Sequence, residues 1–105
     1  MGYKFALQIP VNQLSQRLPN GDDVLRCFET RVALPLTVID RQPATGSYAF
    51  GNTIRKQWPE DFVIKVDERE CYVIFHVASV HQSVVLSTLS SCLLAAGVTG
   101  VFDEL

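Results

Sequence analysis

The chain lacks any long run of apolar residues, even though 48% of its 105 residues are hydrophobic. No apolar stretch approaches the roughly 20 residues that a membrane-spanning helix needs. The N-terminal segment also lacks the cleavage site of a signal peptide, and residues 3–9 alternate between apolar and polar types instead of forming an apolar centre. We therefore expect a cytoplasmic protein without membrane contacts, folded as a single domain over residues 1–105.

Cysteine is scarce, and its spacing argues against the usual cysteine-based sites. Cys27, Cys71 and Cys92 form an odd set without C-x-x-C spacing. A disulfide framework or a structural zinc site would need paired cysteines. Two of the three lie in segments that we expect to be buried, so we predict free, reduced thiols.

Motifs of catalysis and cofactor binding are also absent. His76 and His81 lie close to serines in the sequence, but nothing supplies the third group that would orient a base toward a nucleophile. Gly46 and Gly51 have the separation of phosphate-loop glycines, but Asn-Thr follows where Lys-Ser or Lys-Thr is required. No spacing fits zinc or calcium ligands. The sequence therefore predicts no catalytic residues, no metal ion and no cofactor, and we expect a protein that is not an enzyme.

The chain does contain a clear hydrophobic periodicity. Apolar residues alternate or run together in four short segments, which predicts strands at 3–9, 62–66, 71–77 and 98–102. Spacings of three and four predict a helix from Asp22 or Asp23 to the residues before Pro35, and another over 80–96. Segment 71–77 is almost continuously apolar, so we expect an interior strand that is covered on both faces.

Each predicted helix has one apolar face and its own capping signals. The apolar faces are formed by Leu25, Phe28 and Val32 in the first helix, and by Val85, Leu89, Cys92, Leu93 and Ala96 in the second. Asp22 or Asp23 can cap the start of the first helix, and Ser79 the start of the second. Gly97 supplies a left-handed residue just past the end of the second helix.

The order strand, helix, strand, strand, helix, strand is that of the ferredoxin-like fold, the split βαβ arrangement. We therefore predict an α+β two-layer sandwich in which two helices cover a four-stranded antiparallel sheet, with segments 3–9 and 71–77 in its centre. The signal is weak over about 36–60, which we treat as a long insertion. Within it we expect a short strand at 36–39, a turn at 41–47 and a strand at 48–54 that Gly51 interrupts.

Acidic residues are concentrated in the second half of the chain. Residues 41–59 contain three basic residues and no acid, whereas residues 60–105 contain seven acids and two basic residues. The predicted topology divides these acids into two rims at opposite ends of the sheet. One rim consists of Glu60, Asp61, Asp103 and Glu104, and the other of Asp67, Glu68 and Glu70. Such a field repels nucleic acid and favours a basic partner, the alternative being solvated charges that only keep the protein soluble.

Three segments of the second half stand out as motifs: Trp58-Pro59-Glu60-Asp61-Phe62, Tyr72-Val73-Ile74-Phe75-His76, and the stretch from Leu89 through Gly97 to Phe102-Asp103-Glu104. Together they resemble the second half of small bacterial immunity proteins from polymorphic toxin systems, including contact-dependent inhibition. The resemblance covers residues 58–105. It implies a cytosolic single-domain α/β protein without enzymatic activity, which binds one cognate toxin domain and blocks it.

The charge distribution is compatible with this implication. Many toxin domains that act on nucleic acid are basic around their active sites, and an inhibitor would present carboxylates to them. Our working hypothesis is that such a domain binds one acidic rim, first the rim of Glu60, Asp61, Asp103 and Glu104 with Trp58 beside it, and second the rim of Asp67, Glu68 and Glu70. A desolvated aromatic anchor would come from Tyr48, Trp58 or Tyr72.

Two other functions stay open. A ferredoxin-like regulatory module would bind a small metabolite between helix and strand ends and dimerise through its sheet, although its usual glycine-rich turn is replaced here by Ala78-Ser79-Val80. Segment 41–58 interleaves cations with aromatics, as a single-strand nucleic-acid platform does, although neither central strand carries the RNA-recognition motif. The acidic remainder argues against a nucleic-acid partner, and the sequence leaves a homodimer open.

Overall fold

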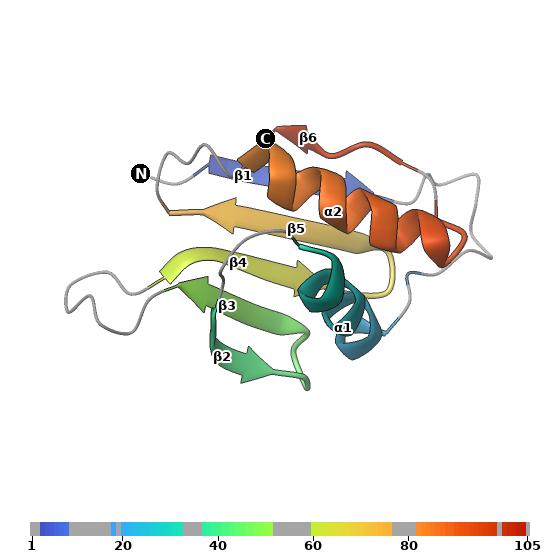
Figure 1. Cartoon of the computed structure of the whole chain (residues 1–105). Coiled ribbons are helices and arrows are strands. Elements are labelled where there is room, and N and C mark those ends of the chain that lie inside the picture. The colour runs from blue at the N-terminus through green and yellow to red at the C-terminus, as the bar shows by residue number, and fades with distance from the viewer. Residues whose placement is uncertain are drawn as a thin grey trace.

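The computed structural model describes residues 3–8, 18, 20–32, 37–51, 60–76, 82–98 and 100–104. Within these residues, the elements are β1 (Tyr3–Gln8), α1 (Gly21–Arg31), β2 (Thr37–Gln42), β3 (Ser47–Gly51), β4 (Glu60–Val66), β5 (Glu70–Phe75), α2 (Gln82–Ala95) and β6 (Asp103–Glu104). The strands form one antiparallel sheet in the order β2-β3-β4-β5-β1-β6. Both helices pack on the same face of this sheet (Figure 1). The protein is therefore a mixed α+β structure of two layers, and neither described helix is long and apolar enough to cross a membrane.

The sheet has six strands in the described residues instead of the predicted four. The additional strands, β2 and β3, come from the segment in which the sequence signal is weak. Tyr48 and Phe50 alternate with smaller residues in β3, and each is only 1% exposed. Because these two rings fill the space under α1, the short strand is held in the sheet by burial as well as by its pairing with β4.

The turn between β2 and β3 depends on Gly46. Its φ of +69° lies in the left-handed region that favours glycine. The Val66 N–H donates to the Gly46 carbonyl at 2.8 Å, and a Cβ on Gly46 would lie 2.1 Å from the Val66 carbonyl oxygen. The turn therefore packs directly on the end of β4, with no room for a side chain.

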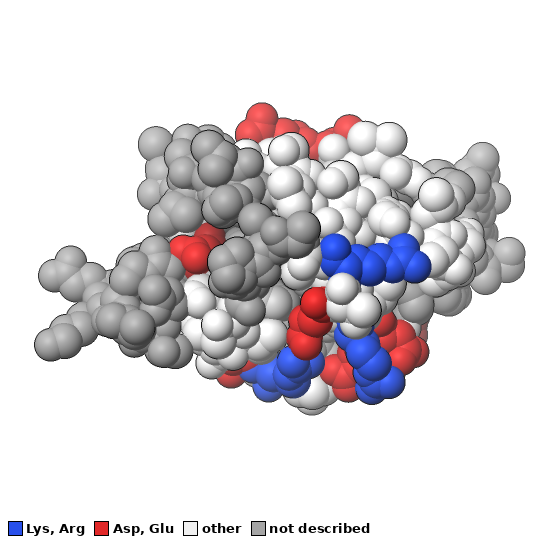
Figure 2. All heavy atoms as spheres, viewed as in Figure 1, with Lys and Arg blue, Asp and Glu red and all other residues white. Residues whose placement is uncertain are grey.

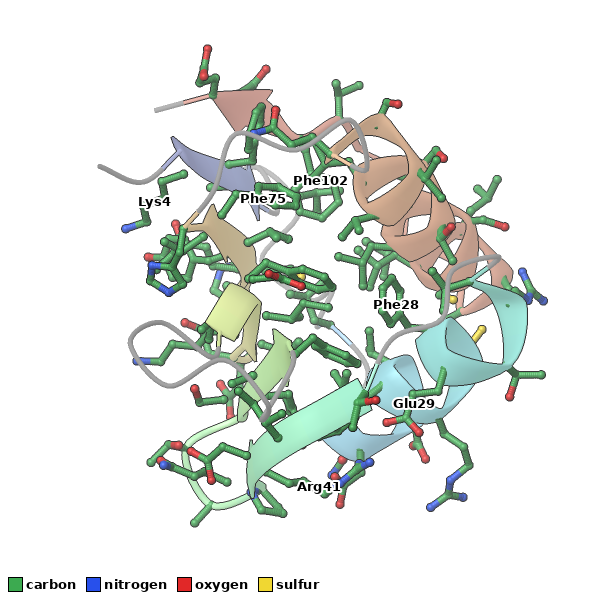
Figure 3. The ribbon with its side chains drawn as sticks, turned by 60° about the vertical axis from the view of Figure 1, so that its left-hand side comes forward. Lys4, Phe28, Glu29, Arg41, Phe75 and Phe102 are labelled. Atoms are coloured by element: carbon green, nitrogen blue, oxygen red, sulfur yellow. The ribbon has the colours of Figure 1, made fainter. Side chains whose placement is uncertain are left out.

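Strand β5 lies between β4 and β1, but it is fully buried on one face only. Cys71, Val73 and Phe75 point toward the helices and are at most 1% exposed, whereas Tyr72 and Ile74 on the other face are half-buried. The expectation of cover on both faces is therefore wrong for the described residues. The reason is that α1 and α2 lie on the same side of the sheet (Figure 3).

Helix α1 is capped by a residue that the sequence analysis did not consider. Asn20 is the N-cap, and its side-chain oxygen accepts a hydrogen bond from the Asp22 N–H at 2.8 Å. Asp22 and Asp23 lie instead in the first turn of the helix, where a negative charge interacts favourably with the helix dipole. The predicted apolar face is confirmed by Leu25 and Phe28, both 0% exposed.

Helix α2 has the predicted apolar face over most of its length. Its buried residues are Val85, Leu89, Cys92 and Leu93. Ala96 is exposed, in contrast to the prediction, because the helix ends at Ala95. Gly97 then turns the chain with a φ of +86°, as its position predicts. The predicted cap, Ser79, lies outside the described residues.

The last strand is shorter than the sequence predicts and begins later. β6 consists of Asp103 and Glu104, which pair with the middle of β1. Val98 is 3% exposed and Phe102 packs against the core from a half-buried position. Val98 and Phe102 therefore pack on the core beside α2 instead of pairing as a strand, whereas Val101 is 75% exposed.

Aromatic rings form the centre of the core under α1. Phe28 meets Phe50 edge-on with 5.4 Å between ring centroids and meets Phe62 at 6.3 Å, and Phe50 stacks on Phe62 at 5.0 Å. Such pairs contribute about 0.5–1.5 kcal/mol each beyond the burial of their area. Phe28 is therefore a main link between α1 and strands β3 and β4.

Candidate functional site

The first predicted acidic rim is divided between two separate strands. Glu60 and Asp61 begin β4, whereas Asp103 and Glu104 form the edge strand β6. The pairings place Asp103 and Glu104 beside the middle of β1, whereas β4 begins at one end of the sheet, and β5 and β1 lie between the two pairs. At about 4.8 Å per strand, the two pairs are separated by roughly 14 Å across the strands alone. Acidic side chains line the edge of the molecule where β6 lies (Figure 2).

The three candidate anchor residues have different environments. Trp58 lies outside the described residues. Tyr48 is 1% exposed, so its ring belongs to the core and not to the protein surface. Tyr72 is half-buried on the sheet face opposite the helices, and the Lys4 Nζ lies 4.3 Å from the centroid of its ring. Of the two described candidates, Tyr72 is thus the one that a partner can reach.

The second predicted rim occupies the tight turn between β4 and β5. Asp67 organises this turn, because its Oδ1 accepts hydrogen bonds from the N–H groups of Arg69 at 2.9 Å and Glu70 at 2.8 Å. The Asp67 N–H also donates to the Glu70 carbonyl at 3.0 Å. These local bonds fix the backbone of the turn. Asp67, Glu68 and Glu70 therefore project from defined backbone positions.

Helix α1 adds two carboxylates to the same end of the sheet. The Leu18 N–H donates to the Glu68 carbonyl at 2.8 Å, which attaches the chain to the β4–β5 turn shortly before α1 begins. Asp22 and Asp23 follow in the first turn of α1. We define the acidic end as the five residues Asp22, Asp23, Asp67, Glu68 and Glu70.

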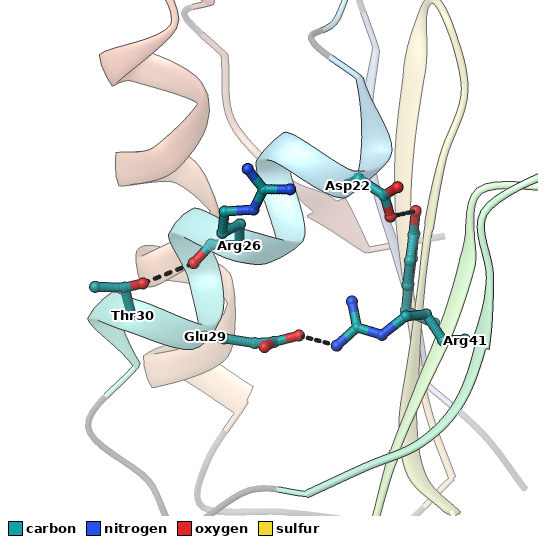
Figure 4. A network of polar contacts seen from close by, with 6 residues as sticks. Asp22, Arg26, Glu29, Thr30 and Arg41 are labelled. Atoms are coloured by element: carbon teal, nitrogen blue, oxygen red, sulfur yellow. Dashed lines mark hydrogen bonds and ion pairs between the residues drawn. The ribbon is translucent and has the colours of Figure 1, made fainter.

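Tyr48 fixes the position of α1 over the sheet. Its hydroxyl donates a hydrogen bond to the Asp22 Oδ1 at 2.8 Å (Figure 4). Burial of the ring, then the hydrogen bond and the negative charge of Asp22, raise the pKa of Tyr48 to about 12, with Arg41 acting in the opposite direction. Gly21 allows this close contact, since a Cβ there would lie 3.1 Å from the Tyr48 hydroxyl oxygen. The bond therefore ties the first turn of α1, and with it part of the acidic end, to β3.

The two segments that form the acidic end contain few basic residues. Residues 20–26 and 67–70 contain five carboxylates and two basic side chains, Arg26 and Arg69. Arg41 lies nearby on β2, but its guanidinium forms an ion pair with Glu29 of α1 at 2.7 Å (Figure 4). Both partners of that pair are well exposed, so it adds little stability. The acidic end therefore carries a net negative charge.

The acidic end is a surface and does not resemble a metal centre. Among the residues that the structure describes, no group of three or more His, Cys, Asp or Glu could hold a metal ion. His81 lies outside those residues, and His76 is half-buried at the end of β5. The arrangement of the carboxylates supports electrostatic contact with a cationic partner.

Segment 41–58 forms no exposed aromatic platform in its described part. Tyr48 and Phe50 are each 1% exposed and face the helices, and Arg41 is engaged in its ion pair. Residues 52–59 lie outside the described part of the chain. Bases stack on aromatic rings that solvent can reach. The described residues of this segment therefore offer nothing on which a base could stack.

Asp22 and Asp23 belong to the acidic end but were missed by sequence reasoning, because they were considered only as helix caps. The predicted topology could have shown that these two residues lie near the β4–β5 turn. The first predicted strand runs antiparallel to the strand at 71–77, so its end lies beside the turn that precedes residue 71. Acids soon after the first strand are therefore expected near Asp67, Glu68 and Glu70.

Comparison of the chain with protein-family models, with curated proteins and with solved structures found no match. The resemblance of residues 58–105 to immunity proteins therefore stays a prediction.

Proposed function

We propose that this protein is a non-enzymatic inhibitor that binds a basic toxin domain through the acidic end. The observation that carries this proposal is the grouping of five carboxylates by two elements, the first turn of α1 and the β4–β5 turn. Carboxylates on one surface attract a cationic protein and increase its association rate. Asp22 and Asp67 are held by hydrogen bonds within the protein, so the surface needs little rearrangement when it binds.

The chemistry of the acidic end fits a toxin domain that acts on nucleic acid. Such a domain holds phosphate groups in a basic groove, and carboxylates can occupy the positions that the phosphates would take. Asp23 and Glu68 are exposed and would meet the groove directly, whereas Asp22 and Asp67 also hold the local structure together. The resemblance of residues 58–105 to immunity proteins supports the same class of partner.

We infer that the fold contains a ferredoxin-like unit in which strands β4, β5, β1 and β6 lie next to one another under two helices. The order of these strands supports this inference, because β1 and β5 are central and each is antiparallel to its neighbours. β2 and β3 would then extend the sheet beyond β4. We place the protein in the cytoplasm, where inhibitors of this class act.

The test uses the gene directly upstream, which should encode a large protein ending in a basic domain. That domain is produced separately, and its binding to this protein is measured by titration calorimetry. We expect a complex of one copy of each protein, and we expect coexpression to relieve the toxicity of the domain. The variant Asp23→Asn/Glu68→Gln should bind more weakly than the wild type.

The matched control is Asp103→Asn/Glu104→Gln, which removes the same charge from β6. If binding weakens only in this control, the binding surface lies at β6. If binding weakens equally in both variants, the effect depends on the net charge of the protein and not on the position of the carboxylates. An upstream domain that does not bind at all would contradict the proposed inhibitor function.

A further inference from the structure

The sheet face opposite the helices has apolar side chains at its centre and two lysines beside them. Tyr72 and Ile74 of β5 lie on this face, and residues that pair directly in antiparallel strands point to the same face. The pairings with β1 and β4 therefore add four residues: Lys4, Ala6, Val63 and Lys65. Figure 3 shows Lys4 on the side of the sheet away from both helices. Both lysines are exposed, whereas Val63, Tyr72 and Ile74 are half-buried. We call this surface the open face.

The open face also carries two carboxylates near its border. Asp103 pairs with Ala6, and Glu70 precedes Tyr72 by two residues in β5, so both point to this face. Among the described residues, no ion pair joins either lysine of the open face to an acid. The Lys4 Nζ lies instead 4.3 Å from the centroid of the Tyr72 ring. The open face therefore carries both signs of charge, and its lysines can meet carboxylates of another molecule.

We propose that the open face binds the open face of a second copy of the chain, with a two-fold axis that crosses the strands between Tyr72 and Ile74. A two-fold axis makes each contact twice. Tyr72 of one copy then packs on Ile74 of the other. Lys4 lies over Ala6 of the other copy, roughly 4.8 Å from the strand that carries Asp103. Sheets pack about 10 Å apart, so the lysine side chain can reach that carboxylate.

The position of the acidic end selects the direction of this axis. An axis parallel to the strands would place the acidic ends of both copies side by side, where like charges repel. An axis that crosses the strands places them at opposite ends of the dimer. Each copy then keeps its acidic end free for one toxin domain. The dimer therefore does not depend on the proposed inhibitor function, and it leaves the ratio of one domain to one copy unchanged.

A second copy fits the open face better than a basic protein or a nucleic acid does. Lys4 and Lys65 would repel a basic domain, whereas Glu70 and Asp103 would repel phosphates. Lys4 also lies over the ring of Tyr72, where a base would have to stack. A surface that carries both signs of charge around an apolar centre complements the open face, and the open face itself is such a surface.

The size of the open face predicts a weak dimer. Six strands at about 4.8 Å and about five residues at 3.4 Å give roughly 500 Å² per copy, or about 1,000 Å² for both copies. This total lies at the lower limit of specific interfaces. We therefore expect a dissociation constant of about 10–100 μM.

Sedimentation equilibrium of the full chain over about 5–500 μM tests the proposal, because this range brackets the expected constant. We expect the mass to rise from that of one chain to that of two. Ile74→Arg should weaken the dimer about tenfold or more, since it places two cations close to the two-fold axis. The matched control is Leu94→Arg, which adds the same charge at a 60% exposed position of α2. The control should leave the constant within about twofold of the wild type.

A charge exchange identifies the residues in contact. Lys4→Asp and Asp103→Lys should each weaken the dimer about fivefold, and the double variant Lys4→Asp/Asp103→Lys should regain most of the wild-type affinity. Circular dichroism checks that each variant is folded. If Ile74→Arg fails to fold, the charge exchange decides by itself, because Lys4 and Asp103 are exposed.

Three results would overturn the proposal. These are a chain that stays monomeric throughout the concentration range, equal weakening by Ile74→Arg and Leu94→Arg, and a double variant that associates no better than the single variants. If the chain is monomeric and Ile74→Arg instead weakens binding of the toxin domain, that domain and not a second copy covers the open face.

Discussion

Replacing Tyr48 by phenylalanine should loosen α1 from the sheet while leaving the packing of the core intact. The ring is 1% exposed and would remain in place, so only the hydroxyl and its 2.8 Å bond to Asp22 are lost. Hydrogen bonds to charged groups contribute about 1.5–3 kcal/mol. Asp22 is half-buried and can bond to water instead, so we expect a decrease of about 1–2 kcal/mol in the free energy of unfolding. In a domain of this size, that lowers the melting temperature by roughly 5–10 °C.

The same substitution should change the dependence of stability on alkaline pH. The pKa of Tyr48 is raised from 10.0 to about 12 in the folded protein. Because the folded pKa lies above the unfolded value, the neutral tyrosine stabilises the fold fully below about pH 10, and this contribution is lost as the pH rises toward 12. The wild type should therefore lose stability over this range faster than Tyr48→Phe, and the two curves should converge.

Urea denaturation followed by far-ultraviolet circular dichroism measures both effects. A double-mutant cycle with Asp22→Ala isolates the bond from other roles of the two residues, and we expect a coupling energy of about 1–2 kcal/mol. An unfolding free energy of Tyr48→Phe equal to that of the wild type at pH 7, together with a coupling energy near zero, would refute the role given to this bond.

Two further predictions concern the core and the turns, and urea denaturation measures both. Phe28→Ala should lower the free energy of unfolding by about 3–5 kcal/mol, because it removes a 0% exposed ring that contacts two strands. A loss below about 1.5 kcal/mol would show that Phe28 does not link α1 to the sheet. Gly46→Ala should cost more than about 3 kcal/mol, since its Cβ would meet the Val66 carbonyl at 2.1 Å. Gly97→Ala is the matched control, with a similar positive φ but no atom within 4 Å of the Cβ, and should cost only about 1–2 kcal/mol. Equal losses in both glycine variants would contradict the close packing of the β2–β3 turn.

Hydrophobic periodicity predicted both helices and the positions of β1, β4 and β5, because those segments are long or strongly patterned. It underestimated β2 and β3. Their two large buried rings, Tyr48 and Phe50, are separated by a single alanine and flanked by glycine and turn residues. Such a short pattern becomes informative only when α1 is present to cover it. Segment 98–102 shows the opposite error, since Val98 and Phe102 are apolar for packing beside α2 and not for pairing in the sheet.

Two acidic rims were predicted from the order of elements. Asp67, Glu68 and Glu70 lie together at the β4–β5 turn, but Asp103 and Glu104 pair with the middle of β1 and not with the end of the sheet at which β4 begins. Sequence reasoning did not join Asp22 and Asp23 to Asp67, Glu68 and Glu70. The connection depends on one backbone hydrogen bond, from Leu18 to Glu68, and on the side-chain bond from Tyr48 to Asp22. Neither bond leaves a periodic pattern in the sequence.

The association rate constant with the basic partner tests the central claim most directly. A carboxylate about 5 Å from a cation in water contributes about 0.8 kcal/mol, so loss of two carboxylates should slow association about tenfold at low salt. At physiological salt, where the screening length is about 8 Å, the effect should fall to about fivefold.

Stopped-flow mixing at two salt concentrations compares Asp23→Asn/Glu68→Gln with Asp103→Asn/Glu104→Gln, after the melting temperature of each variant has been checked. We predict slow association and a weaker salt dependence for the first variant, and a change of less than about twofold for the second. Equal rate constants for the wild type and Asp23→Asn/Glu68→Gln at low salt would contradict a binding function of the acidic end.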